Sequence, residues 1–207
     1  MTQVKPAAEQ IVYIVDDDDA MRDSLVWLVE SQGFVVQAFA SAEAFVAAYR
    51  DEMTGCVVLD VRMPGMSGLE LHEWLTARQS VLPVVFISGH GDVPMAVSAL
   101  KKGAVDFIEK PFNDRDMLHL IEQCMKLDRT HHEQRRQNVV VARRLSSLTE
   151  REREVLALIV AGKLNKQVAD VLNISIKTVE AHRGRIMDKM GVRSVAELVQ
   201  AVLSQKQ

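Results

Sequence analysis

The sequence predicts two domains of different class, a doubly wound parallel α/β domain followed by a smaller all-α domain. Three observations carry this prediction. Short apolar runs alternate with helical patterns up to residue 127, whereas every pattern after residue 147 is helical. The chain of 207 residues is long enough for two small domains. Its charge also changes along the chain. Residues 1–128 are acidic, with 10 Lys and Arg and 20 Asp and Glu. Residues 129–207 are basic, with 15 Lys and Arg and 8 Asp and Glu, and this excess of positive charge suits polyanion binding.

Five apolar runs are predicted to form the strands of the first domain. Because these runs are apolar on both alternating faces, they favour a parallel sheet covered by helices on each side. The runs are IVYIV (11–15), FVVQAF (34–39), CVVLD (56–60), PVVFI (83–87) and VDFI (105–108). Helices are predicted near 19–32, 41–50, 67–79, 92–102 and 114–127. Five βα units in this length predict a flavodoxin-like (βα)5 fold with strand order 2-1-3-4-5.

Composition excludes several other classes of protein. Residues 1–10 lack the apolar stretch of a signal peptide. The longest apolar run, VLPVVFI (81–87), is too short to span a bilayer. Cys56 and Cys124 form neither a disulfide framework nor a metal-ligand spacing, and Cys56 is expected in the core. We therefore expect a cytoplasmic protein that makes no membrane contact.

Polar side chains follow four of the five predicted strands. Asp16 and Asp17 follow the first strand, Asp60 ends the third, and Ser88 and Lys110 follow the fourth and fifth. In a 2-1-3-4-5 sheet the connections change direction between strands 1 and 3, and ligands bind at the carboxyl ends of the strands there. Three carboxylates, a hydroxyl and an ammonium are thus expected to converge on one edge.

This set of side chains suits phosphoryl chemistry. Neighbouring carboxylates need a cation, and oxygen ligands alone favour Mg²⁺, with Mn²⁺ as the other candidate. A carboxylate such as that of Asp60 can attack phosphorus, while Lys110 neutralises the transferred group and Ser88 donates a hydrogen bond to it. The alternative is that these acids merely favour the N-terminal dipole of a following helix. That alternative suits Asp18 and Asp19 but leaves the serine and the lysine unexplained.

Four segments resemble, in the same order, the motifs of the two-component receiver domain: DD (16–17), LDVRMPGMSG (59–68), SGHGDVPMAV (88–97) and GAVDFIEKPF (103–112). The third is especially similar to the FixJ-type subgroup, and the resemblance covers about residues 10–127. It implies a CheY-like receiver in which Asp60 accepts the phosphoryl group. It further implies that Asp17 and Asp60 bind Mg²⁺ directly, that Asp16 acts through water, and that the backbone carbonyl of Arg62 is another ligand.

The resemblance also implies a switch. Ser88 would be the switch hydroxyl and Phe107 the switch aromatic, with Lys110 joined to Pro111 by a cis peptide bond. A phosphoryl group would draw Ser88 inward, and Phe107 could then move into the space that Ser88 leaves. This movement would shift the equilibrium between two conformations of the receiver surface. Taken without the resemblance, Phe107 is an ordinary core aromatic.

The second part of the chain begins with a charged segment. Residues 128–147 are predicted to be a linker that continues the fifth helix, with His131 and His132 on its solvated surface rather than in a metal site. Thr149 and Glu152 then fit a capping box, and Asn165 is expected to cap the next helix. Helices are predicted over 150–161, 165–172, 176–190 and from 194 onward. The predicted domains are a receiver at 1–127, a linker at 128–147 and a helical domain at 148–207.

The helices at 165–172 and 176–190 fit a helix-turn-helix. On the second of them, Val179, Ile186 and Met190 share a core-facing side. Gly184 costs about 1 kcal/mol relative to alanine inside a helix, which suits a helix pressed against a groove floor. A generic helical bundle with a basic surface is the alternative. The candidate DNA-binding residues are Lys177, Thr178, Glu180, Ala181, His182, Gly184, Arg185 and Lys189.

Residues 148–190 closely resemble the LuxR-type output domain, and the resemblance extends to about residue 203. It implies phosphate contacts from Lys177, Thr178, His182 and Lys189. It implies base contacts, which alone carry sequence information, from Glu180, Ala181 and Gly184. Such domains bind DNA in pairs, so a dimer is implied.

Together these features predict a response regulator of the FixJ/NarL type. A sensor histidine kinase would phosphorylate Asp60, after which the chain forms a homodimer, binds promoter DNA and recruits RNA polymerase as an activator. No enzymatic activity is expected beyond Mg²⁺-dependent self-phosphorylation and self-dephosphorylation. One alternative is a DNA-binding regulator whose receiver acts without phosphorylation. Another is an aspartate-nucleophile phosphatase of the haloacid-dehalogenase kind, which needs an acid where this chain has Arg62.

Overall fold

The computed structural model describes residues 9–89 and 93–204. Contacts divide the chain into two units between His132 and Glu133, and each unit is described by itself. The domain boundaries expected at 127 and 147 stay predictions. Three sequence expectations lie outside the described residues: the missing signal peptide over 1–8, the start of a helix at 92, and the centre of the 88–97 motif.

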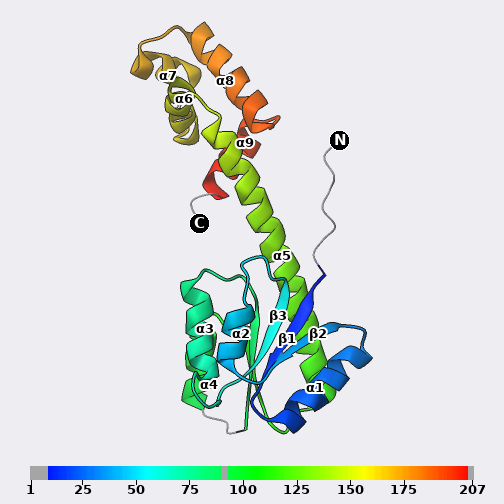
Figure 1. The fold of residues 1–207 in the computed structure, drawn as a ribbon. Helices are drawn as coiled ribbons and strands as arrows, with labels where there is room; N and C mark the ends of the chain where they lie inside the picture. The colour runs from blue at the N-terminus through cyan, green and yellow to red at the C-terminus, as the bar shows by residue number, and fades with distance from the viewer. Residues whose placement is uncertain (1–8, 90–92, 205–207) are drawn as a thin grey trace. The chain divides into compact units, whose positions relative to one another are not determined.

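The first unit contains one sheet of five parallel strands in the order β2-β1-β3-β4-β5 (Figure 1). The strands are β1 (Ile11–Val15), β2 (Val35–Phe39), β3 (Gly55–Asp60), β4 (Val84–Ser88) and β5 (Asp106–Glu109). The predicted strand order is confirmed. Val15 of β1 pairs with Leu59 of β3, so Asp16 and Asp60 follow neighbouring positions at the carboxyl edge of the sheet.

Helices cover both faces of this sheet, because alternate strand residues are apolar on each side (Figure 1). The helices are α1 (Asp19–Ser31), α2 (Ala42–Ala48), α3 (Gly68–Ala77), α4 (Val93–Lys101) and α5 (Asp114–Ser146). Residues of α1 and α5 pack on one face with Val12, Ile14 and Val58. Residues of α2, α3 and α4 pack on the other face with Val15 and Leu59. The two cores hold the strand ends in fixed positions.

Helix α5 continues through the predicted linker to Ser146, and its middle is tied to the first unit by polar contacts. The Gln10 side chain donates from Nε2 to Asp128 Oδ2 at 2.7 Å and to the Met125 carbonyl at 2.8 Å. Arg129 Nε donates to Gln10 Oε1 at 2.6 Å. Asp128 is 1% exposed, so these contacts anchor a buried charge between the residue before β1 and the helix.

His131 and His132 do not lie on solvated helix surface, so that expectation was wrong. Both side chains are half-buried. His131 Nδ1 lies 3.1 Å from the Val81 carbonyl, and His132 Nε2 lies 3.3 Å from Asp128 Oδ1. The physical reason is that this part of α5 still packs against the first unit, which a count of charged residues along the segment does not reveal.

The second unit is helical around its own core. After the end of α5 come α6 (Glu150–Val160), α7 (Asn165–Leu172), α8 (Ile176–Met190) and α9 (Val195–Leu203). The core contains Val155, Ile159, Val179, Ile186 and Met190, which confirms the predicted inner side of α8. The capping box at Thr149 and Glu152 is confirmed as well. Within the described residues, no helix is both long and apolar enough to cross a membrane.

Asn165 does not cap α7, contrary to expectation. The helix begins at Asn165 itself and Leu164 holds the capping position. Gln167 Oε1 accepts a hydrogen bond from the Leu164 backbone N–H at 3.0 Å. Gln167 therefore satisfies the N–H of the capping residue, whereas the first-turn N–H groups that a capping asparagine would serve find no acceptor in the Leu164 side chain.

Candidate functional site

The carboxyl edge of the sheet holds a buried cluster of one ammonium and two carboxylates. Lys110 Nζ donates to Asp16 Oδ2 at 2.9 Å and to Asp60 Oδ1 at 2.7 Å. The Asp16 and Asp60 side chains are 1% and 9% exposed, and the Lys110 side chain is 18% exposed. Asp16 follows β1, Asp60 ends β3 and Lys110 follows β5. Three of the five groups predicted to converge are therefore in contact.

The turn after β1 places the four consecutive aspartates in different environments. Asp16 turns inward, and its Oδ1 accepts a hydrogen bond from the Asp18 backbone N–H at 2.9 Å. Asp18 caps α1 by accepting from the backbone N–H groups of Ala20 and Met21. Asp17 is exposed. Asp16 therefore belongs to the cluster, while Asp18 stabilises the start of a helix.

The loop after β3 is closed around Asp60. Asp60 Oδ2 accepts from the Arg62 backbone N–H at 2.8 Å. The Val61 carbonyl accepts from the Gly68 N–H at 3.0 Å, which brings the loop back to its start. Gly68 lies so close that a Cβ atom there would be 2.1 Å from the Asp60 carbonyl oxygen. Glycine is required by this approach of the helix to the strand end.

Burial and charge act on the cluster in opposite directions. Burial raises the pKa of Asp60, and the hydrogen bond from Lys110 reduces this effect without cancelling it. Burial alone would lower the pKa of Lys110, but its hydrogen bonds to Asp60 and Asp16 outweigh burial and the pKa rises. The lysine is therefore held in its charged form between two acids with little access to water.

The two predicted switch residues lie on the neighbouring strands. Ser88 is 2% exposed at the end of β4, and its carbonyl accepts from the Lys110 N–H at 2.7 Å. Phe107 in β5 is half-buried, with its ring 6.5 Å from that of Phe86. The peptide bond between Lys110 and Pro111 is cis, as the resemblance implied. Ser88 is thus adjacent to the cluster through the backbone of Lys110.

The outer side of α8 presents most of the candidate DNA-binding residues to solvent. His182 is half-buried, whereas the exposed members are Lys177, Thr178, Glu180, Ala181, Gly184, Arg185 and Lys189. Ser175 caps the helix by accepting from the Thr178 N–H at 3.0 Å. Gly184 has open space where a Cβ atom would lie, with nothing within 4 Å. No neighbour in the described part of the second unit therefore explains this glycine.

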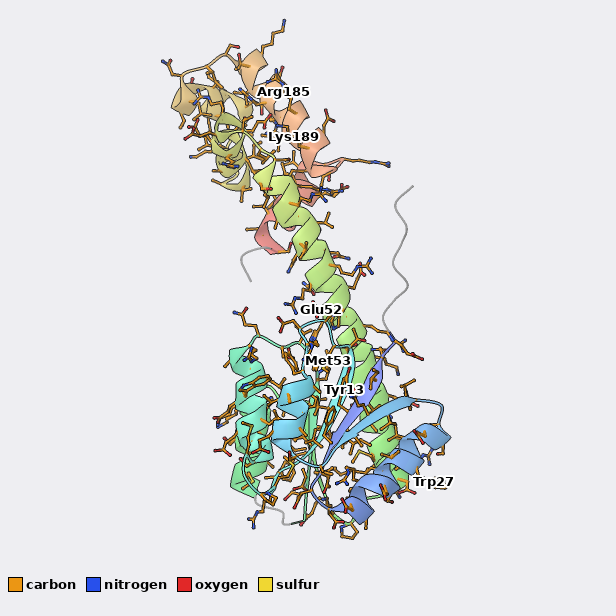
Figure 2. The ribbon with its side chains drawn as sticks, in the orientation of Figure 1. Tyr13, Trp27, Glu52, Met53, Arg185 and Lys189 are labelled. Carbon is orange, nitrogen blue, oxygen red and sulfur yellow. The ribbon has the colours of Figure 1, made fainter. Side chains whose placement is uncertain are left out.

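Lys189, labelled with Arg185 in Figure 2, has partners inside the second unit. Its Nζ donates to Glu152 Oε2 at 2.7 Å and to the Ser147 carbonyl at 3.2 Å. Glu152 is 2% exposed, so the lysine balances a buried charge. This ion pair joins α6 to α8 and gives Lys189 a structural role; its DNA contact stays a prediction.

Both parts of the chain match known families. The model described as response regulator receiver domain matches residues 12–122, and the model described as bacterial regulatory proteins, luxR family, matches residues 146–202. The chain belongs to the response regulator family. It is a transcriptional response regulator of a two-component system, which implies a histidine kinase partner and DNA binding.

Relatives of this response regulator match over nearly the whole chain. The transcriptional regulatory protein FixJ of Bradyrhizobium diazoefficiens is 44% identical over 93% of this chain and 94% of its own. The transcriptional regulatory protein TdiR of Thauera aromatica is 41% identical over 98% and 89%. A solved structure of the response regulator StyR is 46% identical, with a TM-score of 0.79, over 94% of this chain and 98% of that one. The arrangement of both parts in sequence is therefore shared.

The receiver cluster suits Mg²⁺ by the chemistry of its donors. Among the described residues, no group of three or more His, Cys, Asp or Glu forms a metal cage by itself. Magnesium rarely needs one, because it keeps several waters and takes one or two carboxylates. In the part of the chain that the structure describes, each oxygen of Asp16 and Asp60 has one N–H partner, which leaves a second lone pair for an ion or its water. The residues present fit the ion.

Among the contacts that sequence reasoning missed, two join segments far apart in the chain. The Glu43 carboxylate accepts from the Met66 N–H beside the receiver site, at 2.8 Å. Arg144, near the end of α5, donates to the Met190 carbonyl at the end of α8, at 2.7 Å. Neither Glu43 nor Arg144 belongs to a motif, and each contacts a residue in a different segment. A cationic residue ending a long helix is the sole sequence signal for the second contact.

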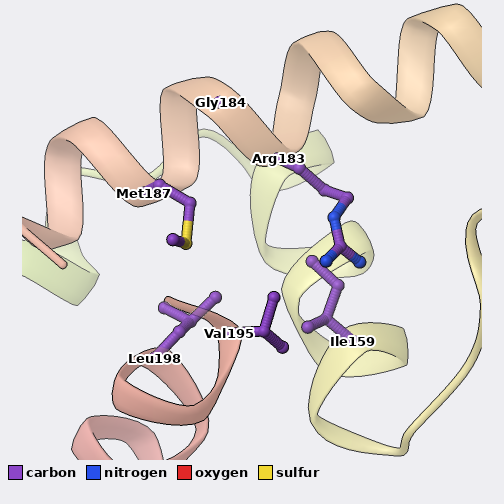
Figure 3. Close-up of a pocket in the computed structure, with 6 residues that line it drawn as sticks. All are labelled: Ile159, Arg183, Gly184, Met187, Val195 and Leu198. Atoms are coloured by element: carbon purple, nitrogen blue, oxygen red, sulfur yellow. The ribbon is translucent and has the colours of Figure 1, made fainter. Parts of the chain in front are cut away.

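A small cavity lies behind α8 (Figure 3). Its volume is about 190 Å³, and apolar side chains from α6, α8 and α9 project toward it. The lining residues are Ile159, Arg183, Gly184, Met187, Val195 and Leu198. Ile159 and Leu198 belong to the domain core and Met187 packs against it, while Gly184 borders the cavity without filling it.

Proposed function

We propose that Asp60 is the phosphoryl acceptor of this response regulator and that its phosphorylation by a sensor histidine kinase controls the LuxR-type domain. The observation that carries the proposal is the position of Lys110 Nζ, which contacts both Asp16 and Asp60 at the carboxyl edge of the sheet. A structural ion pair needs one carboxylate, whereas phosphoryl transfer uses a nucleophile, a cation and further acids together.

The transfer step follows from these groups. A carboxylate oxygen of Asp60 attacks the phosphorus of the kinase's phosphohistidine. The P–N bond breaks, its electron pair returns to the imidazole, and an aspartyl phosphate forms. Lys110 stays beside the acceptor and offers N–H donors to the phosphoryl oxygens, and the Ser88 hydroxyl adds another. Because Asp60 is nearly buried, little water competes with these donors.

The residues that would hold Mg²⁺ are Asp17 and Asp60 directly, Asp16 through water, and the carbonyl of Arg62. When bound, the ion supplies positive charge to the phosphoryl oxygens. Asp17 is exposed beside the end of β1, and the hydrogen bond from the Arg62 N–H to Asp60 holds the Arg62 backbone next to the acceptor. Mn²⁺ would suit the same oxygen ligands.

Phosphorylation would then act through a local change. The phosphoryl group draws the Ser88 hydroxyl inward, Phe107 moves toward the vacated space, and the altered surface favours a homodimer. The paired LuxR-type domains bind promoter DNA in the cytoplasm and recruit RNA polymerase, as an activator. A phosphatase of the haloacid-dehalogenase kind is disfavoured because Arg62 occupies the place of its general acid; turnover would be limited to self-phosphorylation and self-dephosphorylation.

Replacing Asp60 with asparagine should abolish phosphorylation by acetyl phosphate and Mg²⁺, because an amide cannot form the acyl phosphate. Phosphate-affinity electrophoresis measures the modification, and light scattering measures the dimer. The matched control is Asp23→Asn, which changes an exposed carboxylate on α1 and should behave like the wild type. Dimers that form unchanged in D60N would show that the receiver acts without phosphorylation.

Replacing Gly184 with alanine should have opposite effects on stability and DNA binding. A methyl group meets no neighbour there and removes a helix-interior glycine, so α8 should gain up to about 1 kcal/mol. If the DNA groove presses on this position, the affinity for promoter DNA should fall roughly tenfold. Thermal unfolding and fluorescence anisotropy on promoter fragments enriched from genomic DNA measure the two quantities.

The control for this variant is Gln200→Ala, an exposed change on α9 that should leave DNA affinity unaltered. If G184A binds promoter DNA as tightly as the wild type, Gly184 does not lie in the predicted DNA interface.

A further inference from the structure

The loop at residues 61–67 directly follows the acceptor and contacts its carboxylate through the backbone. Both of its ends are fixed, because the Val61 N–H donates to the Ile87 carbonyl at 3.0 Å and the Val61 carbonyl accepts from the Gly68 N–H at 3.0 Å. Arg62 lies near the first end, where its N–H donates to Asp60 Oδ2. On the far side of the loop, Gly65 is exposed and Met66 is half-buried, and this side needs a separate anchor.

Glu43 provides this anchor from a different element. Its Oε1 accepts from the Met66 backbone N–H at 2.8 Å, across 23 positions of sequence. The hydrogen bond from Met66 is the main reason why the pKa of this exposed carboxyl lies below its usual value. The carboxylate is therefore engaged with the loop although it stands at the surface.

The conformation of Gly65 independently supports the same contact. Its φ angle of +76° lies in the left-handed region, and a Cβ atom there would lie 2.5 Å from Glu43 Oε1. A side chain at this position would occupy the place where the carboxylate arrives. The loop is thus shaped to receive Glu43.

Helix α2 holds Glu43 in a fixed place. Ser41 caps the helix by accepting from the Ala44 N–H at 3.1 Å. Ala42 and Phe45, on either side of the glutamate, are fully buried in the receiver core. An anchor fixed in this way can restrain the loop, whereas a carboxylate on a mobile segment could not.

We propose that Glu43 is a positioning residue for the acceptor site, which holds loop 61–67 so that the Arg62 carbonyl and the Asp60 carboxylate keep the orientation needed for Mg²⁺ and the phosphoryl group. This inference rests on the proposed function. Glu43 touches neither the ion nor the acceptor and acts through the backbone of the loop. Loss of an outer contact of this kind typically weakens metal binding by about tenfold or more.

An ordinary role in the first turn of α2 is the competing explanation, because negative charge there favours the helix dipole. The two roles respond differently to substitution. Glu43→Gln removes the charge but keeps a carbonyl oxygen that can accept from Met66, whereas Glu43→Ala removes both. If Glu43 acts only on the helix dipole, both variants should lower stability equally and leave the affinity for Mg²⁺ unchanged. If Glu43 positions the loop, only Glu43→Ala should lower the affinity for Mg²⁺.

The test is a Mg²⁺ titration of the full chain, followed by NMR at the amides of Arg62 and Met66, together with amide hydrogen exchange. In Glu43→Ala the dissociation constant for Mg²⁺ should rise roughly tenfold and the Met66 amide should lose protection. Glu43→Gln should stay close to the wild type. Gly65→Ala disturbs the same contact from the other partner and should resemble Glu43→Ala.

The matched control is Glu73→Ala, which removes an exposed carboxylate on α3 that pairs with Lys102 at 2.5 Å. It should leave both readings unchanged. If wild type and Glu43→Ala bind Mg²⁺ equally well, the positioning role is wrong while the proposed function stands. If the wild type neither responds to Mg²⁺ at Arg62 nor accepts phosphate on Asp60, the proposed function fails and the positioning role falls with it.

Discussion

Replacing Gly68 with alanine is expected to destabilise the receiver by about 3 kcal/mol or more and to abolish phosphorylation. The added methyl group would lie 2.1 Å from the Asp60 carbonyl oxygen and 3.0 Å from Leu59 Cγ. The first contact is with backbone at the end of a central strand, which cannot move aside as a flexible side chain would. Relief requires α3 or the end of β3 to shift, and either movement displaces the acceptor.

The measurement can be confined to the receiver. Both tryptophans of the chain, Trp27 and Trp74, lie there, so tryptophan fluorescence reports receiver unfolding without a signal from the second unit. Trp27 is 73% exposed on α1 (Figure 2), whereas Trp74 packs edge-on against Tyr49 and is the more informative probe. The midpoint of thermal unfolding should fall by roughly 10 °C or more.

A matched control is Gly89→Ala, since a Cβ atom at that exposed position meets none of the described residues within 4 Å. It should leave the midpoint nearly unchanged. A Gly68→Ala protein with wild-type stability and phosphorylation would contradict the close packing of α3 on the end of β3.

Removing the Glu152 carboxylate is expected to be the most damaging polar change in the LuxR-type domain. Glu152→Ala loses the hydrogen bond from the Thr149 N–H and the ion pair with Lys189, and should cost about 2 kcal/mol. The cost stays below that of a fully buried pair because the Lys189 side chain is 35% exposed and partly screened. Glu152→Gln can keep the helix cap and should lose about half as much.

The same carboxylate predicts how stability depends on pH. Hydrogen bonds from Lys189 and the Thr149 backbone lower the pKa of Glu152 from 4.5 to about 2. A carboxyl whose pKa is lower in the folded state stabilises that state fully above its unfolded value, so this contribution is present above pH 4.5. It is lost as the pH falls from there toward about 2. Glu152→Gln should therefore approach the wild type in stability over that window.

Circular dichroism of helix unfolding, recorded across this pH range, measures both effects. The control is Glu154→Gln, which breaks an ion pair with Arg151 whose two side chains are 40% and 44% exposed, and should cost less than about 0.5 kcal/mol. Equal losses in Glu152→Gln and Glu154→Gln would show that the Lys189 pair contributes nothing beyond a surface ion pair.

Much of the receiver could be predicted because its signals are local. Continuous apolar runs mark buried parallel strands, and the rule that their carboxyl ends meet at one edge brings Asp16, Asp60 and Lys110 together before any contact is known. The capping box at Thr149 and Glu152 also lies within four residues. Each of these inferences needs either one segment or one topological rule.

The missed features depend on pairs of segments instead. Glu43 in the first turn of a helix is already explained by the dipole, so nothing in its own segment points to Met66. Lys189 looks like a phosphate contact because it is basic and exposed, and its partner Glu152 looks like a cap. Their ion pair depends on the packing of α6 against α8, and the sequence of neither helix alone predicts that packing.

The contacts of Asp128 decide where this protein can be divided. The receiver family match ends at residue 122 and the sequence suggested 127. A recombinant receiver cut after 122 would lose all three partners of Gln10, and one cut after 127 would keep the Met125 carbonyl but lose Asp128 and Arg129. A cut after His132 keeps Asp128, Arg129 and both histidines with the domain they contact. This cut also coincides with the division of the chain into two units after His132. The receiver therefore ends inside the segment that the sequence predicts to be linker.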